Sequence, residues 1–155
     1  MTRLFGTDGV RGIANKKLTP KLCYDIGRAA AYVLAKGKKG KVLVGRDTRL
    51  SGDLVESSFV AGFMSIGLDV DLAGVIPTPG VAYLTRTGDY LCGVSISASH
   101  NPYEHNGIKF FSSEGLKLDD EVEDEIEEKI LSTTKIYKDV TGEEIGRLNR
   151  STEFT

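Results

Sequence analysis

One polar segment of the chain gathers side chains that could do chemistry. It runs Ser97-Ala98-Ser99-His100-Asn101-Pro102 and continues, after three residues, into Asn106-Gly107-Ile108-Lys109. A serine at the end of a strand is exposed to solvent, and His100 could polarise its hydroxyl. Lys109 could return to the same opening from the next strand. A nucleophile with cationic neighbours suits a site that carries or receives a phosphoryl group.

The same segment has a structural interpretation. Serine, histidine and asparagine side chains commonly bond to nearby backbone groups in turns, and Pro102 stiffens the segment. Short clusters of this composition are frequent in turns that bind nothing. The residues alone therefore leave two interpretations open, a phosphoryl-transfer site and a polar turn, of which the turn is the commoner.

Alternating strands and helices are expected around this segment. Thr19 before Pro20, followed by apolar residues at helical spacing, predicts a helix that runs to about Lys36. Short apolar runs predict strands over residues 41–45, 70–75, 90–96 and 108–111. Further helices are predicted over residues 51–67, 80–86 and 118–131. Such alternation favours an α/β fold with a mainly parallel sheet.

In α/β folds, ligands gather in the loops beyond the carboxyl ends of the strands. Three loops qualify here, over residues 5–12, 45–52 and 97–107. In the second loop Asp47 could pair with Arg46 or Arg49, which we interpret as a structural ion pair. The glycines of the first loop have the wrong spacing for a dinucleotide fingerprint, so we interpret them as serving backbone geometry.

Composition is that of an ordinary globular protein. The chain has 155 residues, 40% of them hydrophobic, and no stretch approaches the roughly 18 uncharged apolar residues of a membrane span. The N-terminus lacks the apolar core of a secretion signal, and Cys23 and Cys92 fit no metal or disulfide framework. We therefore expect one cytoplasmic domain with two buried thiols and no membrane partner.

Charge is unevenly distributed along the chain. Residues 1–113 have 14 Lys and Arg against 9 Asp and Glu, whereas residues 114–155 have 6 against 13. The lysine-rich run 36–41 fits a helix end, and the acidic run 119–128 fits a solvated helix face. The sequence holds no recognisable nucleic-acid module, so we expect no nucleic-acid partner.

Three segments stand out by their order and spacing: Phe5-Gly6-Thr7-Asp8-Gly9-Val10-Arg11-Gly12, Val44-Gly45-Arg46-Asp47-Thr48-Arg49 and the run from Ser97 to Phe111. Together they resemble the N-terminal domain of the α-D-phosphohexomutases, most closely the phosphoglucosamine mutases, and the similarity extends to about Arg150. The resemblance implies a single three-layer α/β/α domain with a mainly parallel, mixed sheet, domain 1 of the phosphohexomutase fold. It assigns residues 1–135 to this domain and 136–155 to a linker and the start of a truncated second domain.

The resemblance implies a role for each matched residue. Ser99 would carry a phosphoryl group, give it to a hexose monophosphate and receive the other phosphate back from the bound bisphosphate sugar. In the phosphoglucosamine mutases the net reaction interconverts glucosamine 6-phosphate and glucosamine 1-phosphate. Arg11 and Lys109 match cationic residues of the active site, Lys109 as the acid/base candidate, and His100 matches a neighbour of the phosphoserine. Arg11 also has a structural interpretation, as a support of the opening glycine loop.

The family also implies Mg²⁺, which prefers near-octahedral oxygen ligands. The phosphate on Ser99 would supply one ligand, and the others belong to an Asp-Gly-Asp-x-Asp run of the second domain that this sequence does not hold. The family's sugar-recognition loop and phosphate clamp belong to later domains too. We therefore expect as partners a hexosamine phosphate, the remaining domains of a full-length chain and a homodimer through this domain, as in many family members. Alone, the chain should show little or no mutase activity.

Two alternatives stay open. The enzyme could prefer another sugar, as a phosphomannomutase or phosphoglucomutase, because the loop that would recognise the sugar is not in this sequence. The domain could also be a binding or dimerisation module that keeps the fold without catalysis, in which case Ser99 would stay unphosphorylated.

Overall fold

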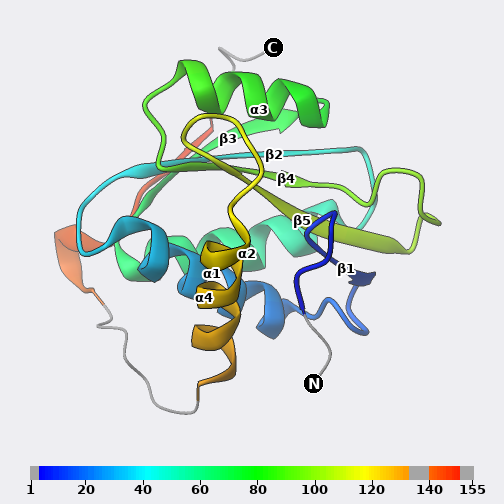
Figure 1. Cartoon of the computed structure of the whole chain (residues 1–155), viewed down its shortest axis with the longest axis horizontal. Helices are drawn as coiled ribbons and strands as arrows, with labels where there is room; N and C mark the ends of the chain where they lie inside the picture. Colours follow the sequence, from blue (N-terminus) through cyan, green and yellow to red (C-terminus); the bar gives the residue numbers. More distant parts are fainter. Residues whose placement is uncertain (1–3, 133–139, 151–155) are drawn as a thin grey trace.

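A six-stranded sheet with helices on both faces forms the core of the structure, a computed structural model that describes residues 4–132 and 140–150 (Figure 1). In chain order the elements are β1 (Val10–Ile13), α1 (Pro20–Ala35), β2 (Lys41–Arg46), α2 (Gly52–Ile66), β3 (Asp69–Val75), α3 (Thr78–Thr87), β4 (Cys92–Ile96), β5 (His105–Ser112), α4 (Asp120–Leu131), the 3-10 helix η1 (Gly142–Glu144) and β6 (Leu148–Arg150). Within those residues no helix has the length and apolar character needed to cross a membrane.

The sheet is mixed and mainly parallel. Its strand order is β1-β5-β4-β2-β3-β6, and neighbours from β4 to β6 pair in parallel. β5 is antiparallel to both β4 and β1. The carboxyl ends of β2, β3 and β4 therefore meet at one edge of the sheet, and β5 begins at that same edge.

The two faces of the sheet are covered unequally. Helices α1, α2 and α4 lie together on one face, and α3 crosses the other face alone (Figure 1). The main core lies under the three helices, where the Phe59 and Phe110 rings are 5.7 Å apart and Phe5 packs on Phe110 at 5.9 Å. A smaller cluster of Leu43, Ala73 and Tyr90 lies under α3. The three-layer α/β/α arrangement predicted from the sequence is confirmed.

Two glycines allow α1 and α2 to pack closely. A Cβ atom at Gly27 would clash with the carbonyl oxygen of Phe59, and one at Gly62 would clash with that of Tyr24. Both clashes are with backbone atoms, which cannot rotate away as a side chain can. The position of α2, and therefore of the loop that precedes it, depends on these two small residues.

Some elements differ from the sequence prediction. Residues 10–13 and 148–150 form the edge strands β1 and β6, which sequence patterns do not mark because both are short and carry few apolar residues. β5 begins at His105 rather than 108, because pairing with β1 extends it. β6 falls in the range expected to form a linker and the start of a second domain, yet it pairs with β3 of this sheet. The domain boundary stays a prediction.

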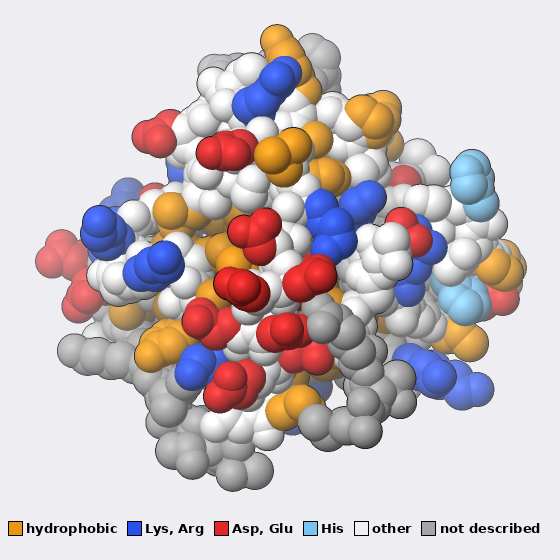
Figure 2. All heavy atoms as spheres, viewed as in Figure 1, with side chains coloured by type: hydrophobic (Ala, Val, Ile, Leu, Met, Phe, Trp, Pro, Cys, Tyr) orange, Lys and Arg blue, Asp and Glu red, His pale blue; other side chains and the backbone are white. Residues whose placement is uncertain are grey.

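The acidic run of α4 is only partly the solvated face expected from the sequence. Figure 2 shows acidic side chains gathered where α4 lies. However, Glu123 is only 4% exposed and accepts a hydrogen bond from Lys117 at 3.2 Å. Glu127 accepts the backbone N–H of Phe5 at 2.5 Å. Two of these acids therefore fasten α4 to the rest of the domain.

Candidate active site

Ser99 lies in the segment that leaves β4, residues 97–105, which we call the serine loop. Its side chain is exposed, and its φ angle of 54° falls in the left-handed region that residues with a Cβ rarely adopt. The backbone N–H of Ser99 donates to Ser97 Oγ at 3.1 Å. A left-handed serine at a strand end is a costly conformation, of the kind that clusters at functional sites.

Arg11 is brought directly to this serine. Its Nη2 donates to Ser99 Oγ at 3.4 Å, while Nη1 lies 3.7 Å from Asp8 Oδ2. Its Nε is buried and has no hydrogen-bond partner among the described residues. A guanidinium with an unused donor beside a hydroxyl can bind further oxygen atoms, such as those of a phosphate.

The register of the sheet explains why Arg11 reaches the serine loop. Arg11 stands in β1, not in a loop as expected from the sequence, and pairs with Gly107 of β5. A Cβ atom at Gly107 would lie 2.9 Å from Arg11 Cγ and 2.9 Å from the carbonyl oxygen of Ser97. Glycine at this position therefore leaves the space through which the Arg11 side chain passes to Ser99.

Lys109 shares a sheet face with Arg11 but is directed elsewhere. It lies two residues beyond Gly107 on β5, so it projects from the same face as Gly107 and its partner Arg11. Its Nζ lies 5.7 Å from the centre of the Phe111 ring, further along the strand. Within residues 4–132 and 140–150 it makes no hydrogen bond to Ser99. The common opening expected for Ser99 and Lys109 thus requires rotation of the lysine side chain.

His100 is placed next to Ser99 by the chain but is exposed and makes no hydrogen bond to described residues. His105, which falls in the loop predicted over residues 97–107, is the half-buried first residue of β5. The structure therefore brings Arg11 to Ser99, and leaves His100 and Lys109 near the site without a contact to the hydroxyl.

The loop after β2 supports the serine loop. Arg49 Nε donates to Asp47 Oδ2 at 3.1 Å, so the ion pair predicted in this loop forms between these two residues. Arg46 instead pairs with Asp53 and Glu56 of α2. Arg49 also bonds to the backbone of the serine loop, a role that its sequence does not mark. The signal available was topological: β2 and β4 are neighbours, so their following loops lie side by side.

Asn106 holds the other end of the serine loop. It is fully buried, its Nδ2 donates to Ser51 Oγ at 2.9 Å, and its Oδ1 accepts the N–H of Gly107 at 2.8 Å. Ser51 occupies the N-cap position of α2, but its hydroxyl makes no cap hydrogen bond to the helix. The asparagine–serine bond instead ties the serine loop to the start of α2.

The described residues do not form a magnesium site by themselves. Among them no group of three or more His, Cys, Asp or Glu residues is close enough to hold a metal ion. Two carboxylates beside the arginines of this site are already paired, Asp47 with Arg49 and Asp8 with Arg11. Mg²⁺ needs several oxygen ligands, so this part of the chain lacks the donor set.

Both cysteines are buried and away from this site. Burial raises the pKa of Cys23 and of Cys92 to about 12. A thiol with such a pKa is almost entirely protonated at neutral pH and is a poor nucleophile. The expectation that both cysteines are buried thiols is confirmed.

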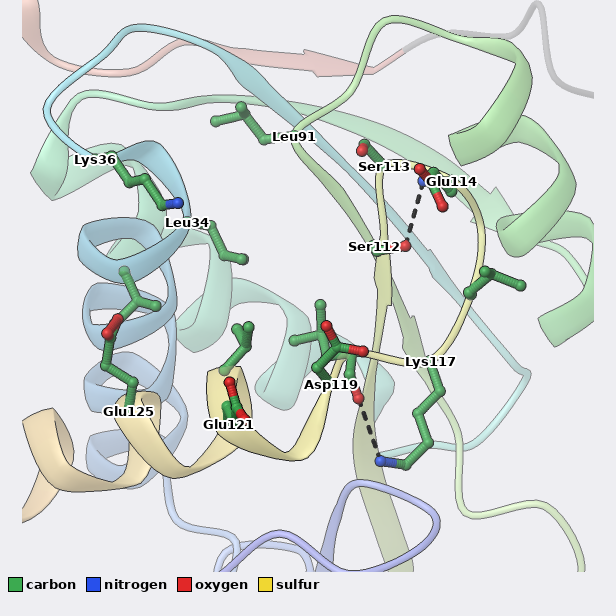
Figure 3. Close-up of a pocket in the computed structure, with 14 residues that line it drawn as sticks. Leu34, Lys36, Leu91, Ser112, Ser113, Glu114, Lys117, Asp119, Glu121 and Glu125 are labelled. Carbon is green, nitrogen blue, oxygen red and sulfur yellow. Dashed lines mark hydrogen bonds between the residues drawn. The ribbon is translucent and has the colours of Figure 1, made fainter.

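A separate hollow of about 530 Å³ opens between the end of α1, the segment after β5 and α4 (Figure 3). Leu34 and Leu91 are among its apolar lining residues, and Lys117 and Glu121 are among its charged ones (Figure 3). Neither Ser99 nor Arg11 lines it. It is therefore distinct from the serine site.

Comparison with known proteins gives consistent matches. A family model described as phosphoglucomutase/phosphomannomutase, alpha/beta/alpha domain I, matches residues 2–137. Among curated relatives, the phosphoglucosamine mutase of Alkaliphilus metalliredigens is 59% identical over 148 residues, which are 95% of this chain and 33% of that protein. The phosphoglucosamine mutase of Syntrophomonas wolfei is 54% identical over 151 residues, 96% of this chain and 34% of that protein. The chain thus spans about a third of the length of these relatives.

Solved structures of similar fold are also matched over only part of their length. A Thermus thermophilus protein described as a phosphomannomutase matches with a TM-score of 0.80 and 26% identity, over 97% of this chain and 33% of that one. A phosphoglucomutase/phosphomannomutase family protein from Burkholderia thailandensis matches with a TM-score of 0.78 and 25% identity, over 96% and 32% of the two chains. The backbone arrangement described above is shared with both.

Proposed function

Because the chain belongs to the phosphoglucomutase/phosphomannomutase family, as its alpha/beta/alpha domain I, we propose that it is the phosphoserine-bearing domain of a sugar-phosphate mutase. The relatives named phosphoglucosamine mutase support glucosamine 6-phosphate and glucosamine 1-phosphate as the two sugars, in preference to mannose or glucose phosphates. The observation that carries the proposal is the bond from Arg11 to the exposed, left-handed Ser99.

Ser99 Oγ is the atom that carries the phosphoryl group. In the forward half-reaction its phosphorus–oxygen bond breaks and a bond forms from phosphorus to the free hydroxyl oxygen of the sugar, whose proton passes to a base. The released Ser99 oxygen takes up a proton, so the products are a bisphosphate sugar and a free serine. In the second half-reaction the serine hydroxyl gives its proton to a base as Oγ bonds to the phosphorus of the other phosphate, and the sugar oxygen that leaves takes up a proton. Atoms balance without any external phosphate.

Arg11 is the cation that holds the transferring group. Phosphoryl transfer depends on positioning and on fixed positive charge around the phosphate oxygens more than on covalent help from the protein. The Nη2 atom already lies 3.4 Å from the serine oxygen, and each terminal nitrogen of a guanidinium has two N–H donors. A planar guanidinium can bond two phosphate oxygens at once, which a lysine ammonium does less well.

Lys109 is the proposed acid/base residue, and His100 the proposed neighbour of the phosphoserine. Lys109 projects from the same sheet face as Arg11, and rotation of its flexible side chain away from Phe111 would bring Nζ towards the serine loop. His100 follows Ser99 directly and is exposed, so its ring can turn to a phosphate on Ser99. Both assignments depend on movements that a bound phosphate would induce.

Mg²⁺ belongs to the proposal only for a full-length protein. The phosphate on Ser99 would supply one oxygen ligand, and the others would come from a second domain, since the described residues lack the donor set. No step of the reaction is therefore assigned to the metal.

A domain boundary near residue 135, a homodimer and a cytoplasmic location stay predictions.

Steady-state turnover of glucosamine 6-phosphate by the full-length protein tests the proposal. Ser99→Ala should abolish turnover, because no other group can accept the phosphoryl in its place. Ser113→Ala, which removes an exposed hydroxyl just after the last residue of β5, should leave turnover unchanged. Turnover by Ser99→Ala at the wild-type rate would refute the phosphoserine role.

A further inference from the structure

The guanidinium group of Arg49 is hydrogen-bonded to the backbone of the serine loop. Its guanidinium donates to four backbone carbonyl groups, those of Ser99 (2.8 Å), Asn101 (2.9 Å), Pro102 (2.6 Å) and His105 (3.0 Å). Its Nε donates to Asp47 Oδ2 at 3.1 Å. A guanidinium has five N–H donors in a fixed plane, so every one of them is used here.

Burial and charge make these bonds strong. The Arg49 side chain is only 11% exposed, and Asp47 balances its charge. Asp47 is itself fixed, because its Oδ1 accepts the N–H of Arg49 at 3.1 Å and its own N–H donates to the carbonyl of Ile96 at the end of β4. Hydrogen bonds from a charged donor are shorter and about twice as strong as neutral ones. Arg49 thereby satisfies carbonyl groups that have no partner in the sheet.

Arg11 and Arg49 donate hydrogen bonds to two different atoms of Ser99. Arg49 bonds to the carbonyl oxygen of Ser99, and Arg11 bonds to its hydroxyl. A residue at a φ of 54° keeps that conformation only where its surroundings impose it. The carbonyl bond to Arg49 is such a constraint, because it fixes the peptide plane that follows Ser99.

We propose that Arg49 is a positioning residue for phosphoryl transfer, which holds Ser99 in its left-handed conformation with Oγ beside Arg11. This inference rests on the proposed function, since it assigns Arg49 to the presentation of the phosphoryl carrier. Arg49 does not touch the reacting atoms. It acts through the backbone of the serine loop.

Lysine cannot replace Arg49 in this role. A lysine head has three donors on one nitrogen, whereas the four carbonyl groups and Asp47 surround a planar fork of three nitrogens. Arg49→Lys keeps the charge and the pair with Asp47 but loses the simultaneous bonds to the loop. The Arg49→Lys variant therefore distinguishes loss of positioning from loss of charge. Because it keeps the ion pair with Asp47, it also serves as the test if Arg49→Ala fails to fold.

Hydrogen exchange on this chain tests the structural half of the proposal. The N–H of Asn101 donates to the carbonyl of Ala98, and that of His105 to the carbonyl of Pro102, both at 3.0 Å. The exchange rate of these two amides should rise at least about tenfold in Arg49→Ala and Arg49→Lys, because the loop opens more easily without the Arg49 bonds. A tenfold rise corresponds to a decrease of about 1.4 kcal/mol in the free energy of opening. The matched control is Arg46→Ala, since Arg46 pairs with Asp53 and Glu56 of α2 instead. Unchanged exchange in both Arg49 variants, or an equal rise in Arg46→Ala, would overturn the proposal.

Kinetics of the full-length enzyme test the functional half. Arg49→Lys should lower kcat about a hundredfold with little change in KM, the cost expected when a reacting group is displaced by about 1 Å. Added guanidinium ion should restore part of the kcat lost in Arg49→Ala. A kcat for Arg49→Lys within twofold of wild type would overturn the positioning role. A wild-type enzyme without turnover would instead refute the proposed function, and the exchange data would still decide whether Arg49 orders the loop.

Discussion

At the scale of single residues, the site depends on a serine and an arginine from opposite parts of the chain. Arg11 reaches Ser99 Oγ across 88 positions of sequence, through the gap left by Gly107. The contact comes from Nη2 of the guanidinium, whose Nε is buried and has no hydrogen-bond partner among the described residues. The consequences of this fit can be measured one residue at a time.

Replacement of Arg11 by lysine should impair the chemical step. The variant keeps one positive charge but loses the planar pair of donors, so we expect kcat of the full-length enzyme to fall by about a hundredfold, the range seen when one donor to a developing charge is removed. Steady-state kinetics with glucosamine 6-phosphate measure this effect. Arg86→Lys is the matched control, since Arg86 is an exposed cation on α3 that lies over Tyr83. An equal loss in both variants would contradict the assignment of Arg11.

The left-handed backbone of Ser99 should show in stability. Ser99→Gly and Ser99→Ala both remove the hydroxyl, but only glycine adopts a φ of 54° without steric cost. We therefore expect Ser99→Gly to be more stable than Ser99→Ala by about 1 kcal/mol, measured by denaturant unfolding of this chain. Equal stabilities would mean that the backbone at this residue is not strained.

The thiols of Cys23 and Cys92 should be unreactive towards alkylating reagents in the folded protein. Because burial raises the pKa of both cysteines to about 12, the reactive thiolate is scarce near neutral pH. Alkylation with iodoacetamide at pH 8, followed by mass spectrometry, should label neither Cys23 nor Cys92 until denaturant is added. Rapid labelling of either residue in the native chain would show that its region opens.

At the scale of elements, the close contact between α1 and α2 determines the position of the loop that precedes α2 and carries Arg49. Gly27→Ala or Gly62→Ala would push a methyl group against backbone carbonyl oxygen, so the helices must separate. We expect a loss of about 1–3 kcal/mol in the free energy of unfolding, as for other overpacked sites. Gly80→Ala in α3 is the control, because its Cβ would meet atoms at an ordinary 3.8 Å. A loss in Gly80→Ala as large as in Gly27→Ala would contradict this explanation.

Local patterns in the sequence predict most elements but not the ones that complete the site. Capping and periodicity suffice for α1, since Thr19 Oγ1 accepts the N–H of Leu22 as expected of an N-cap. β1 is different: its four residues carry no alternating pattern, and it forms because it pairs with β5. That pairing also extends β5 to His105 and places Arg11 on a strand. Sequence motifs therefore locate the serine loop, while the pairing of distant strands determines which side chains reach it.

Side-chain directions are the least predictable part of the site. Proximity in the motif suggests that Lys109 faces Ser99, but Nζ lies over Phe111, an apolar ring on the same strand face. The five bonds of Arg49 depend on the neighbouring positions of β2 and β4, which no spacing in the sequence encodes. Residue types fix the available chemistry, whereas sheet order decides which side chains meet.

At the scale of the whole molecule, the chain spans about a third of the length of the phosphoglucosamine mutases that it resembles, and its described residues lack a metal site. We expect this chain alone to give no detectable turnover of glucosamine 6-phosphate, because neither Mg²⁺ nor the sugar would be held. Turnover by the isolated chain at the rate of a full-length enzyme would contradict the dependence on further domains.

Peptide mapping tests most directly whether Ser99 carries a phosphoryl group. The full-length protein, purified from cells without added phosphatase, should show by intact mass one added phosphate that fragmentation assigns to Ser99. The phosphate should be absent in Ser99→Ala and retained in Ser113→Ala. A fully active enzyme with its phosphate on another residue, or with none on Ser99 at any stage of turnover, would show that Ser99 is not the phosphoryl carrier.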